Sequence, residues 1–320
     1  MGEHPLLSVN IVTRNRKEAL AKALRSIRQQ TYAPLEIVVV DNDSSDGTVE
    51  MLETDWPEVR LIKLHRNIGC QPGRNIGMKN CKGKYIFNLD DDGWLEPTAL
   101  EQIVARFEQD SRIGLIMAAI QEPGRSEEAG NAGALDHERV LGNFEGAAHA
   151  IRTAVLQEVG YFPEYRRGAS ESNLALRMID HGYELIYLPS AVMHHELSAI
   201  ERDANAHRFY HVWHDLENVC RLHPWSRIPL TCLWKATLHA YGALRRGTLR
   251  GYCAGMVRFF YEIPFMFAER TPVRPYALQK QQYLRTYVVT SIEEAARFER
   301  FTLWDMIKGR ISQRGVRPGD

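Results

Sequence analysis

The stretch YIFNLDDDGWLEP, residues 85–97, places three consecutive carboxylates directly after an apolar run. The apolar run predicts a buried strand, and Asp90, Asp91 and Asp92 follow where that strand ends. Like charges this close repel one another, and each is costly to bury without a partner. Three interpretations are open at this point: the residues form a solvated turn, they cap a helix, or they bind a divalent cation through their oxygens.

The segments around this stretch alternate between strand and helix patterns. Apolar, often β-branched runs at 6–13, 35–41, 59–64, 84–90 and 113–120 predict strands. Helical patterns lie between them, at 16–30, 49–55, 73–81 and 97–110. This alternation predicts an α/β domain with a mostly parallel central sheet flanked by helices. Beyond it we expect a strand and a helix within 144–162, a helix from 171, a strand at 183–188, and only helices after about residue 200.

Polar clusters follow three of the predicted strands. They cover residues 13–16, 41–46 and 90–92. Ligands of such sheets bind beyond the carboxyl ends of the strands. We therefore expect the three clusters to converge on one edge of the sheet and to form a binding site there.

Composition narrows the class of protein. The chain has 320 residues, zero formal net charge and 44% hydrophobic residues, which predicts one large domain or a domain with an extension and indicates no nucleic-acid partner. The five cysteines are scattered without a C-x-x-C pair, so neither a disulfide framework nor a zinc site is indicated. There is no signal-peptide pattern and no apolar run of 18 residues, so we expect a cytoplasmic protein without a spanning helix.

The last third of the chain is basic. Residues 221–285 contain eleven Lys and Arg against two acids, interleaved with Leu, Trp, Phe and Tyr. Two interpretations are weighed equally and do not exclude each other. The segment contacts an anionic membrane surface as basic amphipathic helices, or it packs on the catalytic domain or on a second copy as a homo-oligomer contact.

Several motifs together resemble one enzyme family. The segments SVNIVTRNR, EIVVVDNDSSDGT, NIGCQPGRNIG and YIFNLDDDGWLEP, in this order and spacing, are similar to those of family 2 glycosyltransferases. The later segments VGYFPE, ESNLALRMIDHGYEL and LPSAVMHH resemble the second half of the same pattern, so the resemblance covers roughly residues 6–198. It is nearest to the bacterial surface-polysaccharide branch, which includes rhamnosyltransferase-like members.

The resemblance implies a GT-A fold and a division of the chain. The catalytic domain would cover 1–200, with a nucleotide-sugar half at about 1–120 and an acceptor half at about 121–200. Residues 201–320 would form a helical C-terminal region at a membrane surface or an oligomer contact. The Gly-, Glu- and Ala-rich segment 121–142 is expected to be a mobile loop beside the acceptor.

The resemblance also implies a metal site. Asp90 and Asp92 match the ends of the family's D-x-D element, and Asp92 would bind Mn²⁺ or Mg²⁺. His194 or His195 matches a histidine that completes the site. Adjacent residues on a strand point to opposite faces, so only one of the two histidines is expected to reach the metal. A second group, His207, His211 and His214, lies at helical spacing and is expected to be a polar helix face rather than a metal site.

Further residues are implied to bind the nucleotide sugar. Asp41 and Asn42 match the position that recognises the base, although an Asx-turn with a helix cap explains the same cluster without a ligand. Arg14 stands where many members carry an aromatic, so its guanidinium plane would have to stack on the base. Arg74 would serve the nucleotide or hold the Asp cluster. The full expected set is Thr13, Arg14, Asn15, Asp41, Asn42, Asp43, Asn67, Gly69, Arg74, Asp90 and Asp91.

The catalytic base would be Glu171. It takes the place of the family's usual Asp and is one methylene longer, while Asn173 replaces a second acid. Without the resemblance, Glu171 is equally a helix-start carboxylate favoured by the helix dipole.

Taken together, the resemblance implies a metal-dependent, inverting transferase. It would move a sugar from a UDP- or dTDP-linked donor to a hydroxyl of a glycan or lipid-linked acceptor during cell-surface polysaccharide synthesis. Its location would be cytoplasmic, at the inner face of the cell membrane. Two alternatives stay open: a nucleotidyltransferase, which usually has a Gly-rich N-terminal loop with a lysine that is not present here, and a non-catalytic nucleotide-sugar-binding or assembly protein.

Overall fold

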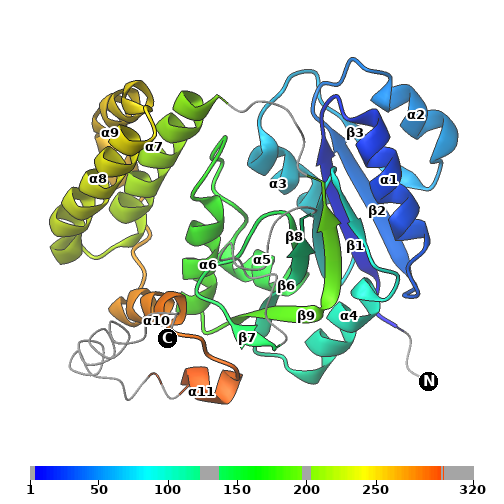
Figure 1. The fold of residues 1–320 in the computed structure, drawn as a ribbon. Helices are drawn as coiled ribbons and strands as arrows, with labels where there is room; N and C mark the ends of the chain where they lie inside the picture. Colours follow the sequence, from blue (N-terminus) through cyan, green and yellow to red (C-terminus); the bar gives the residue numbers. More distant parts are fainter. Residues whose placement is uncertain (1–3, 123–136, 197–202, 297, 299–320) are drawn as a thin grey trace, which may run out of the picture.

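The computed structural model describes residues 4–122, 137–196, 203–296 and 298. A sheet of nine strands forms its centre, with helices on both faces and a separate group of helices at one side (Figure 1). The strands along the sheet are, in order, β3 (Val59–Lys63), β2 (Leu35–Asp41), β1 (Leu7–Thr13), β4 (Tyr85–Asp90), β8 (Ala148–Arg152), β6 (Ile113–Gln121), β9 (Glu184–His195) and β5 (Gly93–Leu95), while β7 (Arg139–Val140) pairs with β9.

The expected α/β fold is confirmed. The strands β3, β2, β1 and β4 are all parallel, which brings the polar residues after β1, β2 and β4 to one edge. The second half of the sheet is mixed, because β8 runs antiparallel to both β4 and β6. The sheet is therefore parallel where the nucleotide half was expected and mixed beyond it.

Six helices cover the sheet. They are α1 (Lys17–Arg28), α2 (Thr48–Asp55), α3 (Cys70–Asn80), α4 (Ala99–Gln109), α5 (Thr153–Val159) and α6 (Ser170–Asp180). Alternate side chains of β4 enter two cores: Tyr85, Phe87 and Leu89 pack with residues of α1 and α4, and Ile86 packs with residues of α5 and α6. The period of two in the sequence thus fixes which face each helix covers.

Two strands differ from the expectation, and both shape the site. The strand expected at 183–188 is β9, which continues to His195 after an irregularity where Ala118 pairs with Leu188 and Ala119 with Val192. The predicted strand ended at Leu188, before Pro189, because proline usually interrupts a strand. The short β5 was not expected; it pairs antiparallel with β9 and places Gly93 opposite His195. The turn of three aspartates therefore lies beside the end of β9.

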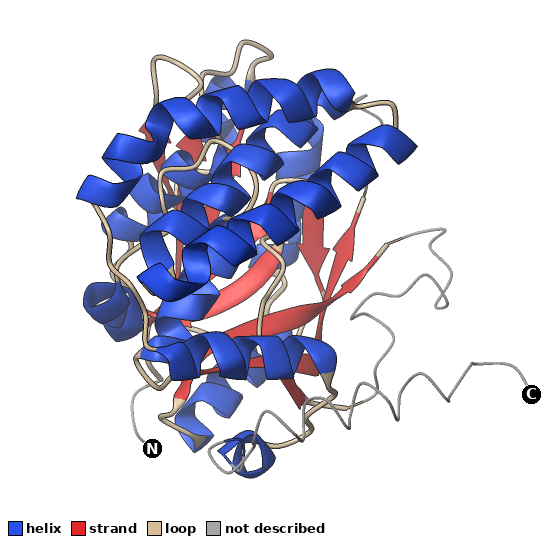
Figure 2. Cartoon of the chain, turned by 90° about the vertical axis from the view of Figure 1, so that its left-hand side faces the viewer, coloured by secondary structure: helices blue, strands red, loops and turns tan. Residues whose placement is uncertain are grey.

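The C-terminal region is helical, as expected, across the part of it that the structure describes. It contains α7 (Ala204–Leu222), α8 (Ile228–Arg245), α9 (Leu249–Ala268), α10 (Pro275–Thr286) and α11 (Ile292–Ala296). The helices α7, α8 and α9 form a layer with its own small core (Figure 2), whereas α10 packs on α6. Within the described ranges, none of the helices has the length and apolarity needed to cross a bilayer.

Two smaller expectations concern loops and cysteines. Most of the expected mobile segment, residues 123–136, lies outside the described residues. All five cysteines are free, in agreement with their spacing.

We expect one glycine to be indispensable for packing α3 against β1. A Cβ at Gly77 would lie 1.8 Å from Oδ1 of the buried Asn10, whose amide donates to Asn88 Oδ1 at 2.8 Å and to the Arg74 carbonyl at 3.0 Å. Gly77→Ala should therefore lower the free energy of unfolding by roughly 1–3 kcal/mol, as overpacking does, measured by urea denaturation.

Gly242→Ala is the matched control, because Gly242 is also in the interior of a helix but meets only the flexible end of Arg208, at 3.4 Å. This variant should be neutral or up to about 1 kcal/mol more stable, from helix propensity. Equal stability of the two variants would contradict the close packing of α3 on β1.

Candidate active site

A cleft of about 920 Å³ opens at the carboxyl ends of β1, β2 and β4. Ten of the expected site residues line it: Thr13, Arg14, Asn42, Asn67, Gly69, Arg74, Asp90, Asp91, Asp92 and Glu171. The expected convergence of the three polar clusters on one edge is thus found. Asn15, Asp41, Asp43, His194 and His195 are not part of the cleft lining.

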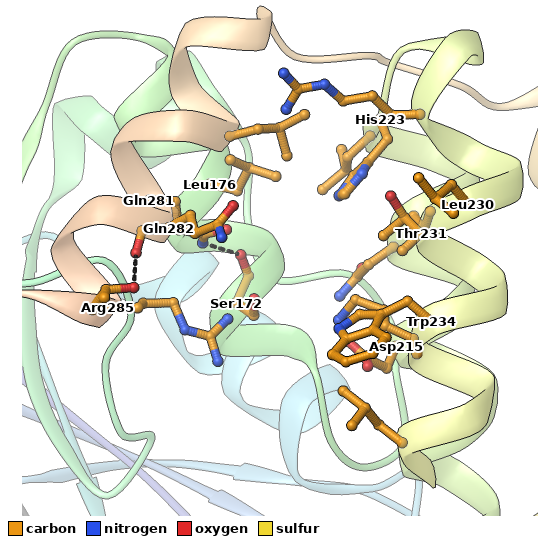
Figure 3. Close-up of a pocket in the computed structure, with 18 residues that line it drawn as sticks. Ser172, Leu176, Asp215, His223, Leu230, Thr231, Trp234, Gln281, Gln282 and Arg285 are labelled. Atoms are coloured by element: carbon orange, nitrogen blue, oxygen red, sulfur yellow. Dashed lines mark hydrogen bonds and ion pairs between the residues drawn. The ribbon is translucent and has the colours of Figure 1, made fainter. Parts of the chain in front are cut away.

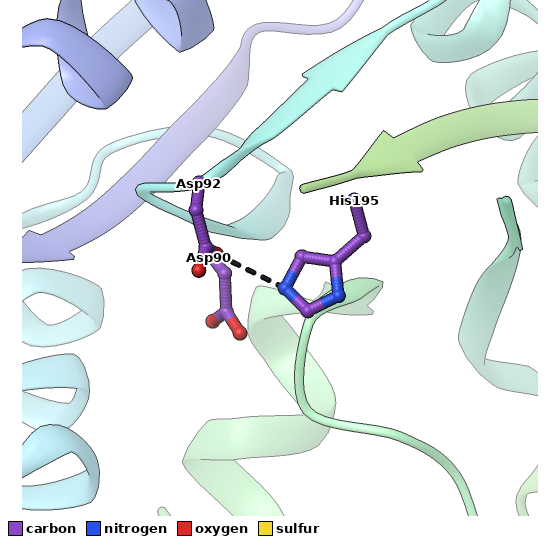
Figure 4. A group of neighbouring side chains, drawn as sticks. All are labelled: Asp90, Asp92 and His195. Carbon is purple, nitrogen blue, oxygen red and sulfur yellow. Dashed lines mark hydrogen bonds and ion pairs between the residues drawn. The ribbon is translucent and has the colours of Figure 1, made fainter. Parts of the chain in front are cut away.

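The end of β4 and the end of β9 together offer a cation site. One ligand atom each from Asp90, Asp92 and His195 lies within 4.8 Å of the others, and His195 Nε2 is 3.0 Å from Asp92 Oδ1 (Figure 4). This is the only group of three or more potential ligands found among the described residues. Two carboxylates and an imidazole fit a divalent ion such as Mn²⁺, since carboxylates suit hard cations and imidazole suits transition metals.

The sequence left open which of His194 and His195 reaches the metal, and the geometry favours His195. His194 points to the other face of β9, where its ring stacks on Trp94 at 5.3 Å and its Nε2 lies 2.6 Å from Glu96 Oε1. The pairing of β5 with β9 selects His195, because adjacent residues alternate across the strand. His207, His211 and His214 do not form a ligand group within the described residues; His214 stacks on Tyr165 instead.

Arginine and histidine compensate the three aspartates. Arg16 Nη1 lies 2.9 Å from Asp91 Oδ1 and 2.5 Å from Asp92 Oδ2, and Thr13 Oγ1 donates to Asp91 at 2.8 Å. Burial raises the pKa of Asp91 to about 6, although the Arg16 charge and the Thr13 hydroxyl oppose that shift. Burial also disfavours charge on Asp92, but the hydrogen bond with His195 and the Arg16 charge outweigh it and lower the pKa of this carboxyl.

Arg16 was not expected as a site residue, although it lies in the polar cluster at 13–16. It sits 21% exposed just before α1, at the mouth of the cleft. The signal that could have found it is its place at the end of the first strand, where a cation can face the acids that end the neighbouring strand.

A chain of hydrogen bonds joins the aspartates to the expected base. Arg74, which is buried, reaches Asp90 Oδ1 with Nη2 at 2.6 Å and Gln71 Oε1 with Nη1 at 3.3 Å. Gln71 Nε2 in turn donates to Glu171 Oε1 at 2.7 Å, and Ser170 Oγ donates to Glu171 Oε2 at 3.0 Å. Of the two roles weighed for Arg74, this geometry supports holding the Asp cluster.

The Arg74–Gln71–Glu171 chain leaves no room for a side chain at Gly146. A Cβ there would lie 2.8 Å from Glu171 Oε1 and 3.1 Å from Arg74 Nη1. Glycine at this position lets the backbone before β8 approach the two charged groups closely.

Asp41 and its neighbours form hydrogen bonds within and between the loops after β1 and β2, and one carboxylate oxygen of Asp41 accepts none. Asp41 Oδ2 accepts from the Ser44 amide at 3.1 Å, whereas its buried Oδ1 has no hydrogen-bond partner. Asn15 Oδ1 accepts from the Ser45 amide at 2.7 Å and so ties the loop after β1 to the loop after β2. Asp43 is exposed on this loop with a positive φ of 71°. The turn interpretation therefore holds, while Asp41 Oδ1 is buried without a hydrogen-bond partner and outside the cleft lining.

Asn42 holds the rim of the cleft in place. Its amide donates to Asn67 Oδ1 and to the Gly69 carbonyl, both at 3.1 Å, and its Oδ1 accepts from the Ile68 amide at 2.9 Å. With all its polar groups used in this way, Asn42 positions the loop before α3.

Several lining residues were not expected. Arg166, Arg167 and Gly168 come from the loop before α6, and Ala206 and Tyr210 come from α7. The pair of arginines is a visible signal in the sequence, but nothing local indicates that this loop faces the aspartates. The contribution of α7 means that residues beyond 200 complete the cleft.

Asn173, which stands where the family pattern has a second acid, joins α6 to α7. Its Nδ2 donates to Asn218 Oδ1 at 2.7 Å, and its Oδ1 accepts from Arg177 Nε at 2.9 Å. Tyr165 donates to the same Asn218 oxygen at 2.8 Å. This buried network holds α6 and α7 together behind the cleft.

A second cavity of about 660 Å³ lies between α6, α7, α8 and α10 (Figure 3). Its walls combine apolar side chains such as Leu176 and Trp234 with the polar groups of Asp215 and Arg285. Gln281 donates to the Ser172 carbonyl at 3.3 Å across one side of it. Because Glu171 lines the first cleft and Ser172 the second, the first turn of α6 separates the two.

Comparison with known proteins identifies the family. The sequence pattern described as "Glycosyl transferase family 2" matches residues 8–172, more than half of the chain. The chain belongs to glycosyl transferase family 2. It is therefore a glycosyltransferase enzyme, which sets aside the nucleotidyltransferase alternative.

Curated relatives match about a third of the chain. An uncharacterized glycosyltransferase of Haemophilus influenzae is 32% identical over 111 residues, covering 35% of this chain and 37% of the relative. The GalNAc(5)-diNAcBac-PP-undecaprenol beta-1,3-glucosyltransferase of Campylobacter jejuni is 34% identical over 106 residues, covering 32% of this chain and 34% of the relative. Each match thus spans less than two fifths of the relative.

Solved structures share the fold over more of the chain. S. aureus TarS 1-349 in complex with UDP-GlcNAc superposes with a TM-score of 0.62 at 15% identity, covering 92% of this chain and 91% of that one. GalNAc-T7 with UDP, GalNAc and Mn2+ gives a TM-score of 0.54 at 17% identity, over 62% and 44% of the two chains. These likenesses establish the GT-A fold.

The geometry predicts which histidine supports metal binding. Mn²⁺ should raise the Tm of the wild-type family 2 protein, since a ligand at about 100 times its Kd stabilises by about 2.7 kcal/mol. His195→Ala and Asp92→Asn should lose most of this rise, because each removes a ligand atom. His194→Ala is the matched control and should keep it. Thermal unfolding with and without Mn²⁺ measures the effect, and equal rises in both histidine variants would contradict the assignment.

Proposed function

We propose that this enzyme transfers a sugar from a UDP- or dTDP-linked donor to a hydroxyl of a glycan or lipid-linked acceptor, with inversion at the anomeric carbon. The observation that carries the proposal is that one cleft holds both the Asp90–Asp92 turn and Glu171, linked through Arg74 and Gln71. A cation-binding end and a general base in one cavity suit displacement of a diphosphate by a hydroxyl.

The nucleotide is proposed to lie across the ends of β1 and β2. Asp41, at the position that the resemblance assigns to the base, would accept from the N3–H of a pyrimidine, and Arg14, which lines the cleft, would stack on the base. Asp90 or Asp91 would accept from the ribose. The similar TarS structures are complexes with UDP-GlcNAc and with UDP, which supports a uridine donor.

The diphosphate is proposed to lie between the Asp turn and the loop before α6. Arg166 and Arg167 line the cleft there and would bind its oxygens. Asp90, Asp92 and His195 would hold a divalent cation, and their mixed donor set favours Mn²⁺ over Mg²⁺. Bound there, the cation would supply positive charge to the leaving diphosphate.

Glu171 is proposed as the general base. Gln71 and Ser170 each donate to one of its oxygens, which fixes the carboxylate and leaves lone pairs for the acceptor hydroxyl. Removal of the hydroxyl proton on the side opposite the diphosphate would let the oxygen attack directly, and a single displacement inverts the carbon. The position of Glu171 in the first turn of α6 also places it at the positive end of the helix dipole, so both interpretations of this residue apply.

The acceptor is proposed to enter beside α6 and α7. Residues 1–120 would form the nucleotide-sugar half, 121–200 the acceptor half, and 201–320 a helical region that closes one wall through Tyr210. The undecaprenol-linked acceptor in the name of the C. jejuni relative supports a lipid-linked substrate and a role in surface-polysaccharide synthesis at the inner face of the membrane. The alternative is a family member that binds nucleotide sugars but does not transfer them.

A donor screen tests the function directly. We expect hydrolysis of one UDP- or dTDP-sugar within a panel, with a rate at least roughly 100-fold lower after EDTA treatment or Asp92→Ala, the scale for loss of a charge-stabilising group. Full activity in EDTA would contradict metal dependence. Tight donor binding without hydrolysis or transfer would favour the non-catalytic alternative.

Glu171→Gln separates the base from a structural role. The change is isosteric, and the new side chain can still accept from Gln71, so donor affinity by calorimetry should be nearly unchanged. Transfer to acceptor should fall by roughly 100-fold or more, the range for removal of a general base. Glu171→Asp should retain part of the activity, since many family members use Asp at this position.

Glu145→Gln is the matched control, because Glu145 is a second glutamate that lines the same cleft. It should keep the wild-type transfer rate. If Glu171→Gln transfers at the wild-type rate, the base is another residue, with Asp91 or Glu145 next to test; if it loses donor binding instead, Glu171 holds the site together.

A further inference from the structure

The exposed apolar side chains are concentrated on two helices. Eleven of the thirteen large hydrophobic residues that are exposed within the described ranges belong to α8 and α9, with exposed fractions from 43% to 74%. They are Leu230, Leu233, Trp234, Leu238, Tyr241 and Leu244 on α8, and Leu249, Val257, Phe260, Tyr261 and Phe265 on α9. Both helices pack on α7 and form the outside of the molecule (Figures 1 and 2). We call these eleven residues the α8–α9 face.

The helix α8 buries only Ile228 and Ala243 and leaves most of its large apolar side chains exposed. Its inner side carries Lys235 and His239, which both bind Asp215 of α7, at 2.6 Å and 3.0 Å. Leu233, Tyr241 and Leu244 are exposed outside the second cavity, whereas Leu230, Trp234 and Leu238 are exposed along the wall of that cavity that α8 forms. A helix on a water-exposed surface normally buries its apolar side, and isolated exposed apolar residues are common whereas a large contiguous patch marks a binding surface. This helix therefore presents its apolar side to a partner.

Positive charge surrounds the face. Arg245, Arg246 and Arg250 are exposed at the turn between α8 and α9, and none has a carboxylate within ion-pair distance among the described residues. The two acids of residues 221–285 are both paired, Glu262 with Arg258 and Glu269 with Arg221 at 2.6 Å. The partner of this surface must therefore be apolar and anionic.

We propose that the α8–α9 face docks on an anionic lipid bilayer. Its Leu, Phe and Val side chains enter the boundary between headgroups and acyl chains, Trp and Tyr lie at the headgroup level, and the three arginines bind lipid phosphates. A second copy of the chain fits less well, because both acids of its residues 221–285 are already paired with arginines and so are not free for Arg245, Arg246 and Arg250. Docking of this kind needs no spanning helix.

The proposal stands on this surface alone and does not depend on the transfer reaction, but it has a consequence for it. The helix α7 supports α8 and α9 on one side and carries Ala206 and Tyr210 of the active-site cleft. Helices pack about 8–10 Å apart, so a docked molecule holds its cleft about one helix layer from the lipid. An acceptor anchored in the bilayer could then reach the cleft.

Vesicle flotation tests the electrostatic part. The full chain should bind phosphatidylglycerol-rich vesicles, bind phosphatidylcholine vesicles weakly, and dissociate as salt is raised. The triple variant Arg245→Ala, Arg246→Ala and Arg250→Ala should bind anionic vesicles roughly 100-fold more weakly, from about 1 kcal/mol per arginine. A control that removes the exposed cations Arg25, Lys79 and Lys82, which lie on α1, α3 and the loop after α3, should bind like the wild type.

A second pair of variants tests the apolar part. Leu233→Glu with Phe260→Glu should abolish vesicle binding, whereas Val288→Glu, a residue of similar exposure (64%) outside the α8–α9 face, should not. Thermal unfolding and donor hydrolysis in solution should stay at wild-type values in all of these variants, which separates this proposal from the proposed function. No binding to anionic vesicles, or equal binding by all variants, would overturn it. So would a wild-type dimer in solution that Leu233→Glu with Phe260→Glu dissociates without any vesicle binding.

Discussion

The structure depends on how three adjacent carboxylates are held at the end of one strand. Asp90, Asp91 and Asp92 would repel one another in isolation, and two of them are buried. Their charges are compensated by groups from three other elements: Arg16 from the loop after β1, Arg74 from α3 and His195 from the end of β9. The cluster can form only if all of these elements are in place, so the fold and the site specify each other.

Arg74 transmits this constraint across the cleft. Its guanidinium is buried between Asp90 and Gln71, and a buried charge that loses its partner costs about 3–5 kcal/mol. Gln71 extends the same network to Glu171, so the carboxylate expected to take a proton is held in register with the end of β4. Asn10 and Gly77 fix α3 beneath this network, because the helix approaches β1 too closely for any larger residue. This polar network therefore fixes the position of Glu171 relative to the Asp90–Asp92 turn, at the two ends of the cleft.

How well the sequence predicts a feature depends on how far apart in the chain the interacting residues lie. The strands β1 to β4 and the convergence of their polar ends follow from local periodicity and from the rule for parallel sheets, and both are found. The sequence predicted that β9 would end at Leu188, before Pro189, and it did not predict β5. Both features depend on pairing between segments about 100 residues apart. That pairing also selects His195 over His194. Arg16, Gln71 and Arg166 were not predicted as site residues for the same reason, because tertiary structure determines which groups they face.

For the C-terminal helices, an amphipathic sequence pattern does not tell what the apolar side of a helix contacts. The basic and aromatic composition of residues 221–285 supports a membrane surface and a protein contact equally well, because both need apolar area. The contacts of Lys235 and His239 with Asp215 show that these polar side chains of α8 face α7, while Leu233, Tyr241 and Leu244 stay exposed. A core helix would bury Leu233 and expose Lys235. The opposite arrangement costs stability in water, and a chain retains it where a partner covers the apolar face. Since α7 forms a wall of the cleft as well as the support of that face, the surface that meets the partner also determines from which side an acceptor can approach Glu171.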